Sequence, residues 1–334
     1  MAGSRLHPNS KRTSTLRRIP LNGALRYRKA PGLEGHVCAF KLASDSSTTV
    51  VEAISGRAMT LVGDEVFLAT PGNRESNRVL VGGVPAGGLV PGKKYWMLAE
   101  SGVVGELITG TPLASGFLHQ VKYLGAVVGD DDRILTLRQF AVAEMDEPID
   151  HGAMVLLIVG TSAEVGKTTV GVSVLRTLLA KGHSRVIVLK ATGTSAVAEI
   201  ATYRDYGAAQ AFDCVDFGLP TTYPSNRKDM DRVFDRALDT CLSIPADAVL
   251  IECGGDMLAA NIPVFLRRLK SRRPPAKVVL AAADPLGAWG ATRTLRDMKM
   301  SVDLITGPCT DTPASRQRTQ ALCKAPAMNM LRDS

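Results

Sequence analysis

The sequence lacks the long apolar segment that would mark a membrane protein. Across its 334 residues no uninterrupted apolar run approaches the ~20 residues that a membrane-spanning helix needs. The basic N-terminal residues are not followed by the apolar stretch of a secretory signal. We therefore expect a protein that neither spans nor binds a membrane.

Closely spaced cysteines are also missing. The six cysteines include no C-x-x-C pair, and this argues against a disulfide scaffold or a zinc cluster. Isolated cysteines are typical of a reducing compartment, so we expect a cytoplasmic protein. The hydrophobic share of 45% and the charged share of 22% are those of an ordinary soluble chain, and the length suggests about two domains.

Acidic residues are absent from residues 1–33, which hold eight lysines and arginines. The remaining 32 basic residues balance the 32 acidic ones, so the net charge of +8 lies in this segment. We expect residues 1–34 to form a basic and mostly disordered tail. Contact with nucleic acid or an anionic surface, or a role as an organelle transit peptide, are the alternatives that this composition leaves open.

Short apolar runs broken by glycine and proline occupy residues 35–150. Runs such as HVCAFKL, EVFLAT and KKYWMLA alternate with turns such as Pro71-Gly72-Asn73 and Pro91-Gly92-Lys93. This spacing predicts a small β-rich domain, either a barrel or a sandwich. The segment contains no pattern of nucleophile and base and no metal-ligand spacing, so its role is not indicated.

From residue 151 to residue 334 the pattern changes to alternating strands and helices. Apolar strands are predicted over 154–159, 185–189, 248–252, 277–282, 302–305 and 327–330. Alternation of such strands with helices predicts an α/β domain with a parallel sheet covered on both faces. Ligands of these sheets bind at the carboxyl ends of the strands.

The first of these strands ends in the clearest chemical signal. Residues 156–170 read LLIVGTSAEVGKTTV, an apolar strand and a glycine-bounded loop that leads through GKT into an amphipathic helix. This order is that of the phosphate-binding loop, or P-loop, of nucleoside triphosphatases (NTPases). Five residues separate Gly160 from Gly166, one more than in the common pattern, and Thr161 stands at the usual first glycine.

Each part of the loop has a role in holding phosphate. Backbone N–H groups and the helix dipole favour negative charge at the start of the helix. Gly166 permits close approach, Lys167 reaches the β and γ phosphates, and the Thr168 hydroxyl binds Mg²⁺. The predicted nucleotide-binding residues are Gly160, Thr161, Glu164, Val165, Gly166, Lys167, Thr168 and Thr169.

Charged residues end three further strands. Lys190, followed by Ala-Thr-Gly, is placed to hold an anionic substrate or phosphate, or else only ends its strand. Glu252, in the sequence ECGGD, is placed to bind Mg²⁺ directly or through water, or to act as a base. Asp284 is the competing strand-end acid, and its simpler role is to cap the next helix.

These motifs resemble those of the dethiobiotin synthetases. GTSAEVGKTT is similar to their GTDT-x-VGKT loop, ECGGD to their EGAGG, and Lys190-Ala-Thr-Gly to their KP-x-x-x-G segment. The resemblance spans about residues 154–330. It implies a P-loop fold, with Glu252 as a Mg²⁺ ligand and Lys190 at the substrate. Ser162 and Ala163 replace the Asp and Thr of the family loop, so biotin synthesis itself is not expected.

A second resemblance concerns a P-loop family that includes D-glutamate N-acetyltransferases. VLKATGTSA is similar to the ATGQTG run of that family. The stretch from Asp213 to Pro220 resembles its aspartate-containing strand, which implies Asp216 as a further metal ligand.

Together these features predict an ATP- and Mg²⁺-dependent enzyme, of kinase or ligase type, that phosphorylates or activates a small acidic metabolite. The predicted catalytic residues are Lys167, Lys190 and Glu252, and the metal ligands are Thr168, Glu252 and Asp216. We also expect the loop 306–311 to contact the base, and the expected partners are the acidic substrate and a second copy of the chain. The alternatives are a nucleotide-dependent regulatory switch or an acyltransferase-type P-loop protein that acts with a partner.

Overall fold

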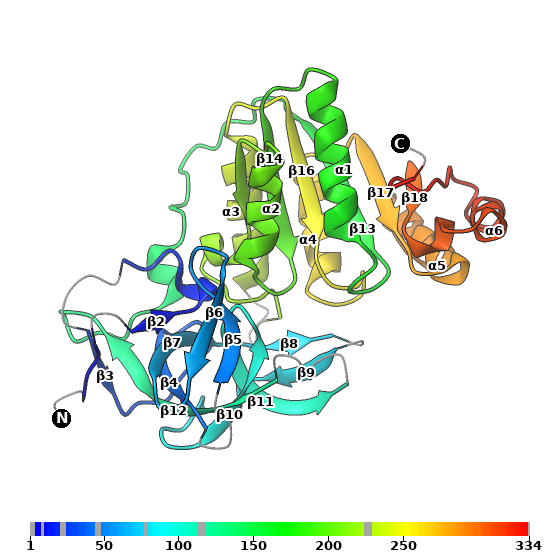
Figure 1. Cartoon of the computed structure of the whole chain (residues 1–334). Coiled ribbons are helices and arrows are strands. Elements are labelled where there is room, and N and C mark those ends of the chain that lie inside the picture. The colour runs from blue at the N-terminus through cyan, green and yellow to red at the C-terminus, as the bar shows by residue number, and fades with distance from the viewer. Residues whose placement is uncertain are drawn as a thin grey trace. The chain divides into compact units, whose positions relative to one another are not determined.

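The computed structural model describes residues 4–7, 10–20, 25–43, 48–76, 79–111, 118–223 and 229–332. The chain forms two compact units, which Figure 1 shows in the colours of the sequence. The β unit comprises Met1–Ala143, Thr194–Ala198 and Cys214–Arg227. The α/β unit comprises Glu144–Gly193, Glu199–Asp213 and Lys228–Ser334. The β unit thus includes two short segments that lie within the predicted domain 151–334.

Five strands of the β unit close into a barrel, which decides between the predicted barrel and sandwich. β12 pairs with β4, β4 with β7, β7 with β11, β11 with β10, and β10 again with β12. The barrel strands are β4 (Cys38–Leu42), β7 (Val66–Pro71), β10 (Lys94–Ala99), β11 (Val103–Gly110) and β12 (Gln120–Val128). The other elements are β1 (Ser4–Arg5), β2 (Lys11–Arg12), η1 (Ser14–Leu16), β3 (Arg26–Arg28), β5 (Thr48–Glu52), β6 (Ala58–Val62), β8 (Arg74–Glu75), β9 (Leu80–Gly83), η3 (Leu137–Phe140) and η4 (Cys214–Phe217).

Strand β4 is apolar on both of its faces. Cys38 and Phe40 belong to a cluster that draws on all five barrel strands. Their neighbours Val37 and Ala39 pack in a second cluster, together with Leu68 and Val127. Because side chains alternate along a strand, the first cluster fills the barrel and the second lies outside it.

The described N-terminal residues cover this outer cluster, and the prediction of a disordered tail over residues 1–34 was wrong for residues 4–7, 10–20 and 25–34. Leu6, Leu16 and Ile19 are buried in the outer cluster. β2 pairs with β7, and the Thr13 N–H donates to the Leu68 carbonyl at 3.0 Å. The few apolar residues of the segment are those that the outer face of the barrel requires.

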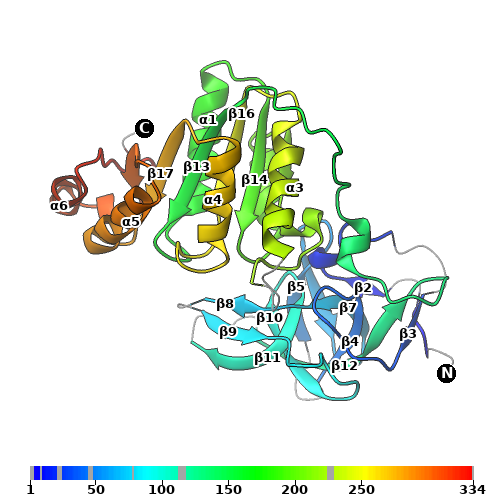
Figure 2. The same cartoon turned by 180° about the vertical axis from the view of Figure 1, so that it is seen from behind.

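The α/β unit has a sheet of six parallel strands in the order β15-β14-β16-β13-β17-β18. Helices α1 and α2 cover one face (Figure 1), and α3 and α4 cover the other (Figure 2). The strands are β13 (Met154–Gly160), β14 (Val186–Thr192), β15 (Gln210–Phe212), β16 (Ala248–Cys253), β17 (Lys277–Ala281) and β18 (Leu304–Thr306). The helices are α1 (Lys167–Ala180), α2 (Val197–Asp205), α3 (Met230–Leu242), α4 (Ile262–Arg272), α5 (Pro285–Asp297), η6 (Pro308–Thr310) and α6 (Pro313–Cys323).

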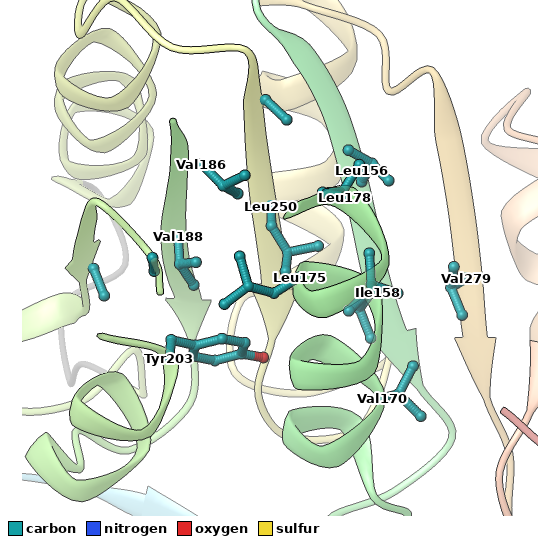
Figure 3. Packing of buried hydrophobic residues seen from close by; sticks show 14 of the residues in the cluster. Leu156, Ile158, Val170, Leu175, Leu178, Val186, Val188, Tyr203, Leu250 and Val279 are labelled. Carbon is teal, nitrogen blue, oxygen red and sulfur yellow. The ribbon is translucent and has the colours of Figure 1, made fainter. Parts of the chain in front are cut away.

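The predicted parallel α/β fold is confirmed, with differences at the edges of the sheet. β15 is an additional strand. In place of a strand over 327–330 the structure has a single bridge from Ala327 to Ile305. One core cluster joins Leu175 of α1 to Ile158 and Leu250 of the sheet, as Figure 3 shows. Burial of each such side chain stabilises the fold by about 1.5–3 kcal/mol. No helix in the described part of the chain has both the length and the apolar character needed to cross a membrane.

Candidate functional site

The loop between β13 and α1 has the geometry of a P-loop. Gly166 precedes the helix with a φ of 83°, in the left-handed region that favours glycine, and Glu164 has a φ of 62°. The first helical hydrogen bond runs from the Val170 N–H to the Gly166 carbonyl at 2.9 Å. The N–H groups of Lys167, Thr168 and Thr169 thus have no partner within the helix, as expected for a first turn. This end of α1 can accept an anion.

Lys167 lies inside the loop rather than in solvent. Its ammonium donates to the Ser162 carbonyl at 2.7 Å, and the residue is buried. A Cβ on Gly160 would come within 2.7 Å of Lys167 Cδ, so this position must stay free of a side chain. Burial lowers the pKa of Lys167, an effect that the nearby Glu252 opposes and the positive charge of Lys190 reinforces. The ammonium is therefore poorly solvated and ready to bind phosphate.

Glu252 joins the P-loop helix to two other elements. At the end of β16, one of its carboxylate oxygens accepts a hydrogen bond from the Thr168 hydroxyl at 3.0 Å. Its other oxygen accepts from the Tyr203 hydroxyl of α2 at 2.6 Å. Glu252 is buried, and these two contacts orient its carboxylate toward the first turn of α1.

The contact of Tyr203 with Glu252 was not predicted from the sequence. Tyr203 is fully buried, and Figure 3 shows its ring beside Leu175 with the hydroxyl directed toward α1. A Cβ on Gly171 of α1 would lie 1.9 Å from that hydroxyl oxygen, so only glycine leaves room for it. A glycine inside an otherwise apolar helix was the one available signal of such a close approach.

Lys190 lies beside Glu252 but is not on a strand next to the P-loop strand. The strand order places β16 between β14 and β13, so Lys190 is one strand further from the P-loop than Glu252. Lys190 pairs with Glu252 in the register of β14 and β16. It is buried, and its ammonium forms an ion pair with Glu199 of α2. In a parallel sheet such register partners point to the same face, which brings Lys190 to the same side as Glu252.

The two remaining strand-end residues have structural roles. Asp284 caps α5, because one carboxylate oxygen accepts from the N–H groups of Leu286 (2.9 Å) and Gly287 (2.8 Å). Thr161 accepts from the Ala283 N–H at 3.2 Å and donates its own N–H to the Ala281 carbonyl at 3.0 Å.

The loop 306–311 lies beside the P-loop, since a Cβ on Gly307 would be 3.3 Å from the Val165 carbonyl oxygen.

Asp216, the third predicted metal ligand, has both carboxylate oxygens engaged by arginines, and its role as a ligand stays a prediction. It belongs to the β unit, where Arg17 and Arg18 hold its two carboxylate oxygens at 2.6 and 3.3 Å. The buried carboxylate is thereby neutralised by the N-terminal segment. The aspartate-containing stretch of the second resemblance serves, in this chain, to attach that segment.

The residues around Glu252 fit a magnesium ion in the presence of a nucleotide. No group of three or more His, Cys, Asp or Glu side chains able to hold a metal occurs among the described residues. Mg²⁺ seldom uses such a cage, because it keeps several waters and binds one or two protein oxygens together with substrate phosphates. Thr168 and Glu252 supply two adjacent oxygens of this kind.

Comparisons with known proteins assign no family to the chain. No family model matches the chain, and no curated protein matches it. Among solved structures the chain is similar to the signal recognition particle receptor FtsY from Elizabethkingia anophelis, with a TM-score of 0.37, 17% identity and coverage of 55% of this chain and 58% of that one. For the signal recognition particle 54 kDa protein from Aeropyrum pernix K1, in complex with GDP, the values are 0.39, 20%, 55% and 42%. For the cell division protein FtsY from Thermotoga maritima they are 0.38, 20%, 55% and 62%.

The chain therefore spans less than two thirds of the length of each of these proteins. Likenesses of this strength say nothing about activity. The assignment of a P-loop NTPase fold depends on the α/β unit itself, with its parallel sheet and the order of β13, loop and α1. The resemblance to dethiobiotin synthetases stays a prediction.

Proposed function

We propose that the α/β unit binds Mg-ATP and transfers the γ phosphate to a carboxylate of a small acidic metabolite. The observation that supports this most is the grouping of Lys167, Lys190 and Glu252, all buried, beside the open first turn of α1. The two buried ammonium groups and the N–H groups of the first turn of α1 form a site for an anion. The Glu252 carboxylate beside the Thr168 hydroxyl forms a site for a cation.

Each side chain has a task in this proposal. Lys167 exchanges the Ser162 carbonyl for the β and γ phosphates, and Thr168 and Glu252 would hold Mg²⁺. Bound Mg²⁺ would neutralise charge on the phosphate oxygens. Lys190 exchanges Glu199 for the carboxylate of the metabolite. Tyr203 positions Glu252.

In the reaction, a carboxylate oxygen of the metabolite attacks the γ phosphorus. The bond from that phosphorus to the β–γ bridging oxygen breaks, ADP leaves, and an acyl phosphate forms. Such a transfer requires positioning and charge neutralisation more than covalent chemistry by the protein. The residues of the site supply both.

The test is ADP release by the full chain with a panel of small dicarboxylic and amino acids. With an accepted acid we expect multiple turnover, and Lys190→Met should lower it by about a hundredfold while ATP binding survives. Lys181→Met is the matched control, since Lys181 is an exposed lysine at the end of α1. A rate of Lys190→Met within a few-fold of wild type would remove Lys190 from the mechanism. ATP binding without turnover on any acid would favour the regulatory switch.

A further inference from the structure

A basic groove lies between α5 and α6, away from the P-loop. It consists of two adjoining hollows of about 320 and 210 Å³. Thr292, Arg296, Cys323 and Lys324 line both of them, Lys299 lines the larger, and Arg293 and Trp289 line the smaller. No carboxylate is among the lining residues of either hollow.

The charge of this groove is uncompensated. Arg293, Arg296, Lys299 and Lys324 form no ion pair within the part of the chain that the structure describes. By contrast, Arg268 and Arg272 of α4 pair with Asp235 and Asp239 of α3. Cations at a helix C-terminus complement the helix dipole, which accounts for one charge at the end of each helix but not for the three that line each hollow.

A buried hydroxyl in the groove provides a second, independent observation. Thr292 is only 6% exposed, and its Oγ1 has no nitrogen or oxygen partner within the described residues. Its neighbour is the Cys323 thiol. Burial raises the pKa of this thiol, and the Thr292 hydroxyl and the positive charge of Arg296 oppose that rise only in part. A buried hydroxyl without an oxygen or nitrogen partner costs about 1–3 kcal/mol, a cost that a ligand oxygen would offset.

The groove is separate from the nucleotide site. α5 starts beside the P-loop, because a Cβ on Gly287 would be 3.6 Å from Thr161 Cγ2. Arg296 and Lys299 lie at the far end of this helix. At a rise of 1.5 Å per residue, that end is about 16 Å from the start.

We propose that this groove binds the multiply charged oxyanion group, a phosphate or a polycarboxylate, of a small molecule. The guanidinium of Arg296 and the ammonium groups of Lys299 and Lys324 pair with the oxyanion. The Thr292 hydroxyl donates to one of its oxygens. Enclosure by two helices favours a small molecule over a polymer, since the larger hollow has the volume of a small ligand site.

Trp289 gives a direct readout of binding. The chain has two tryptophans, Trp96 and Trp289, and only Trp289 lies in the groove. Pyrophosphate and citrate are titrated into the full-length Lys167→Ala protein at constant ionic strength. Because the P-loop lysine is absent, the result does not depend on whether the proposed nucleotide site is correct.

We expect a saturable fluorescence change that is lost in Trp289→Phe. In Arg296→Gln/Lys324→Gln the dissociation constant should rise at least tenfold, and in Thr292→Val it should rise severalfold. Arg318→Gln, which removes an exposed arginine of α6 outside the groove, should stay within twofold of the parent protein. Calorimetry of Thr292→Val provides the same comparison without the tryptophan signal.

Three results would overturn the proposal. The first is the absence of saturable binding of both anions to the parent protein. The second is an equal loss of affinity in Arg318→Gln and Arg296→Gln/Lys324→Gln, which would mean general charge attraction. A single-stranded oligonucleotide that bound more tightly than either small anion would assign the groove to a polymer and would also refute it.

Discussion

Replacing Tyr203 by phenylalanine tests whether the Tyr203 hydroxyl positions Glu252 for the proposed Mg²⁺ site. The change deletes one hydroxyl and keeps the ring in the core cluster. Glu252 is 2% exposed, so water does not readily replace the lost donor at 2.6 Å. A hydrogen bond to a charged group contributes about 1.5–3 kcal/mol, and we expect the free energy of unfolding to fall by an amount in this range.

The same change should weaken the metal site selectively. Loss of a partner that orients a metal ligand commonly costs about 10–100-fold in metal affinity or activity. We expect the Mg²⁺ concentration for half-maximal turnover to rise by that factor, while affinity for nucleotide without Mg²⁺ changes little.

Two further variants make the test specific. Tyr206→Phe is the matched control, because Tyr206 follows α2 and is 48% exposed. Gly171→Ala should improve helix propensity by about 0.5–1 kcal/mol, yet its Cβ would displace the Tyr203 hydroxyl. A Gly171→Ala protein that is less stable and needs more Mg²⁺ therefore confirms the contact. An unchanged Mg²⁺ requirement in Tyr203→Phe would refute the reasoning, whatever its stability.

Three other outcomes follow from the structure. Glu252→Gln should lower Mg²⁺-dependent turnover far more than nucleotide binding. Asp284→Asn, which can still cap α5, should keep a turnover within a few-fold of wild type. The opposite result would assign the metal-binding role to Asp284 in place of Glu252. Because burial lowers the pKa of Lys167, the affinity for a triphosphate should fall as pH rises, and the fall should begin at a lower pH than that at which an ordinary lysine loses its proton. In a titration with a fluorescent nucleotide, Lys167→Arg should remove this pH dependence. Deleting residues 1–20 should lower the melting temperature strongly, because it removes Leu6, Leu16 and Ile19 from the outer cluster. Their burial contributes about 4.5–9 kcal/mol at 1.5–3 kcal/mol for each residue, and a melting temperature within a degree of wild type would contradict this packing.

The P-loop was predictable because its signal is continuous in sequence. An apolar strand, a glycine-bounded loop and an amphipathic helix follow one another within residues 154–180, and each is recognisable alone. Glu252 was predictable for the same reason, as the last acid of an apolar strand that two glycines follow. The capping role of Asp284 also follows from its place before a proline and a helix.

Contacts between distant parts of the chain were not predictable in this way. The order of strands in a sheet cannot be inferred from the residues of any single strand, so the position of β16 between β13 and β14 was not predictable from local sequence. The basic N-terminal residues have the composition of a solvated tail. These residues take a fixed conformation because they pack on the apolar outer face of β4 and because Arg17 pairs with Asp216, 199 residues further along the chain.

That separation has a consequence for how the protein is made. Residues 194–198 and 214–227 complete the β unit, and they lie beyond β14 in the chain. During synthesis the barrel strands leave the ribosome first, but the partner of Arg17 and Arg18 does not yet exist. Contacts of such high sequence separation form slowly, and a partly folded barrel with an uncovered apolar face is prone to aggregate. We therefore expect chains that stop between β12 and η4 to be recovered mainly in aggregates, and the full chain to be soluble.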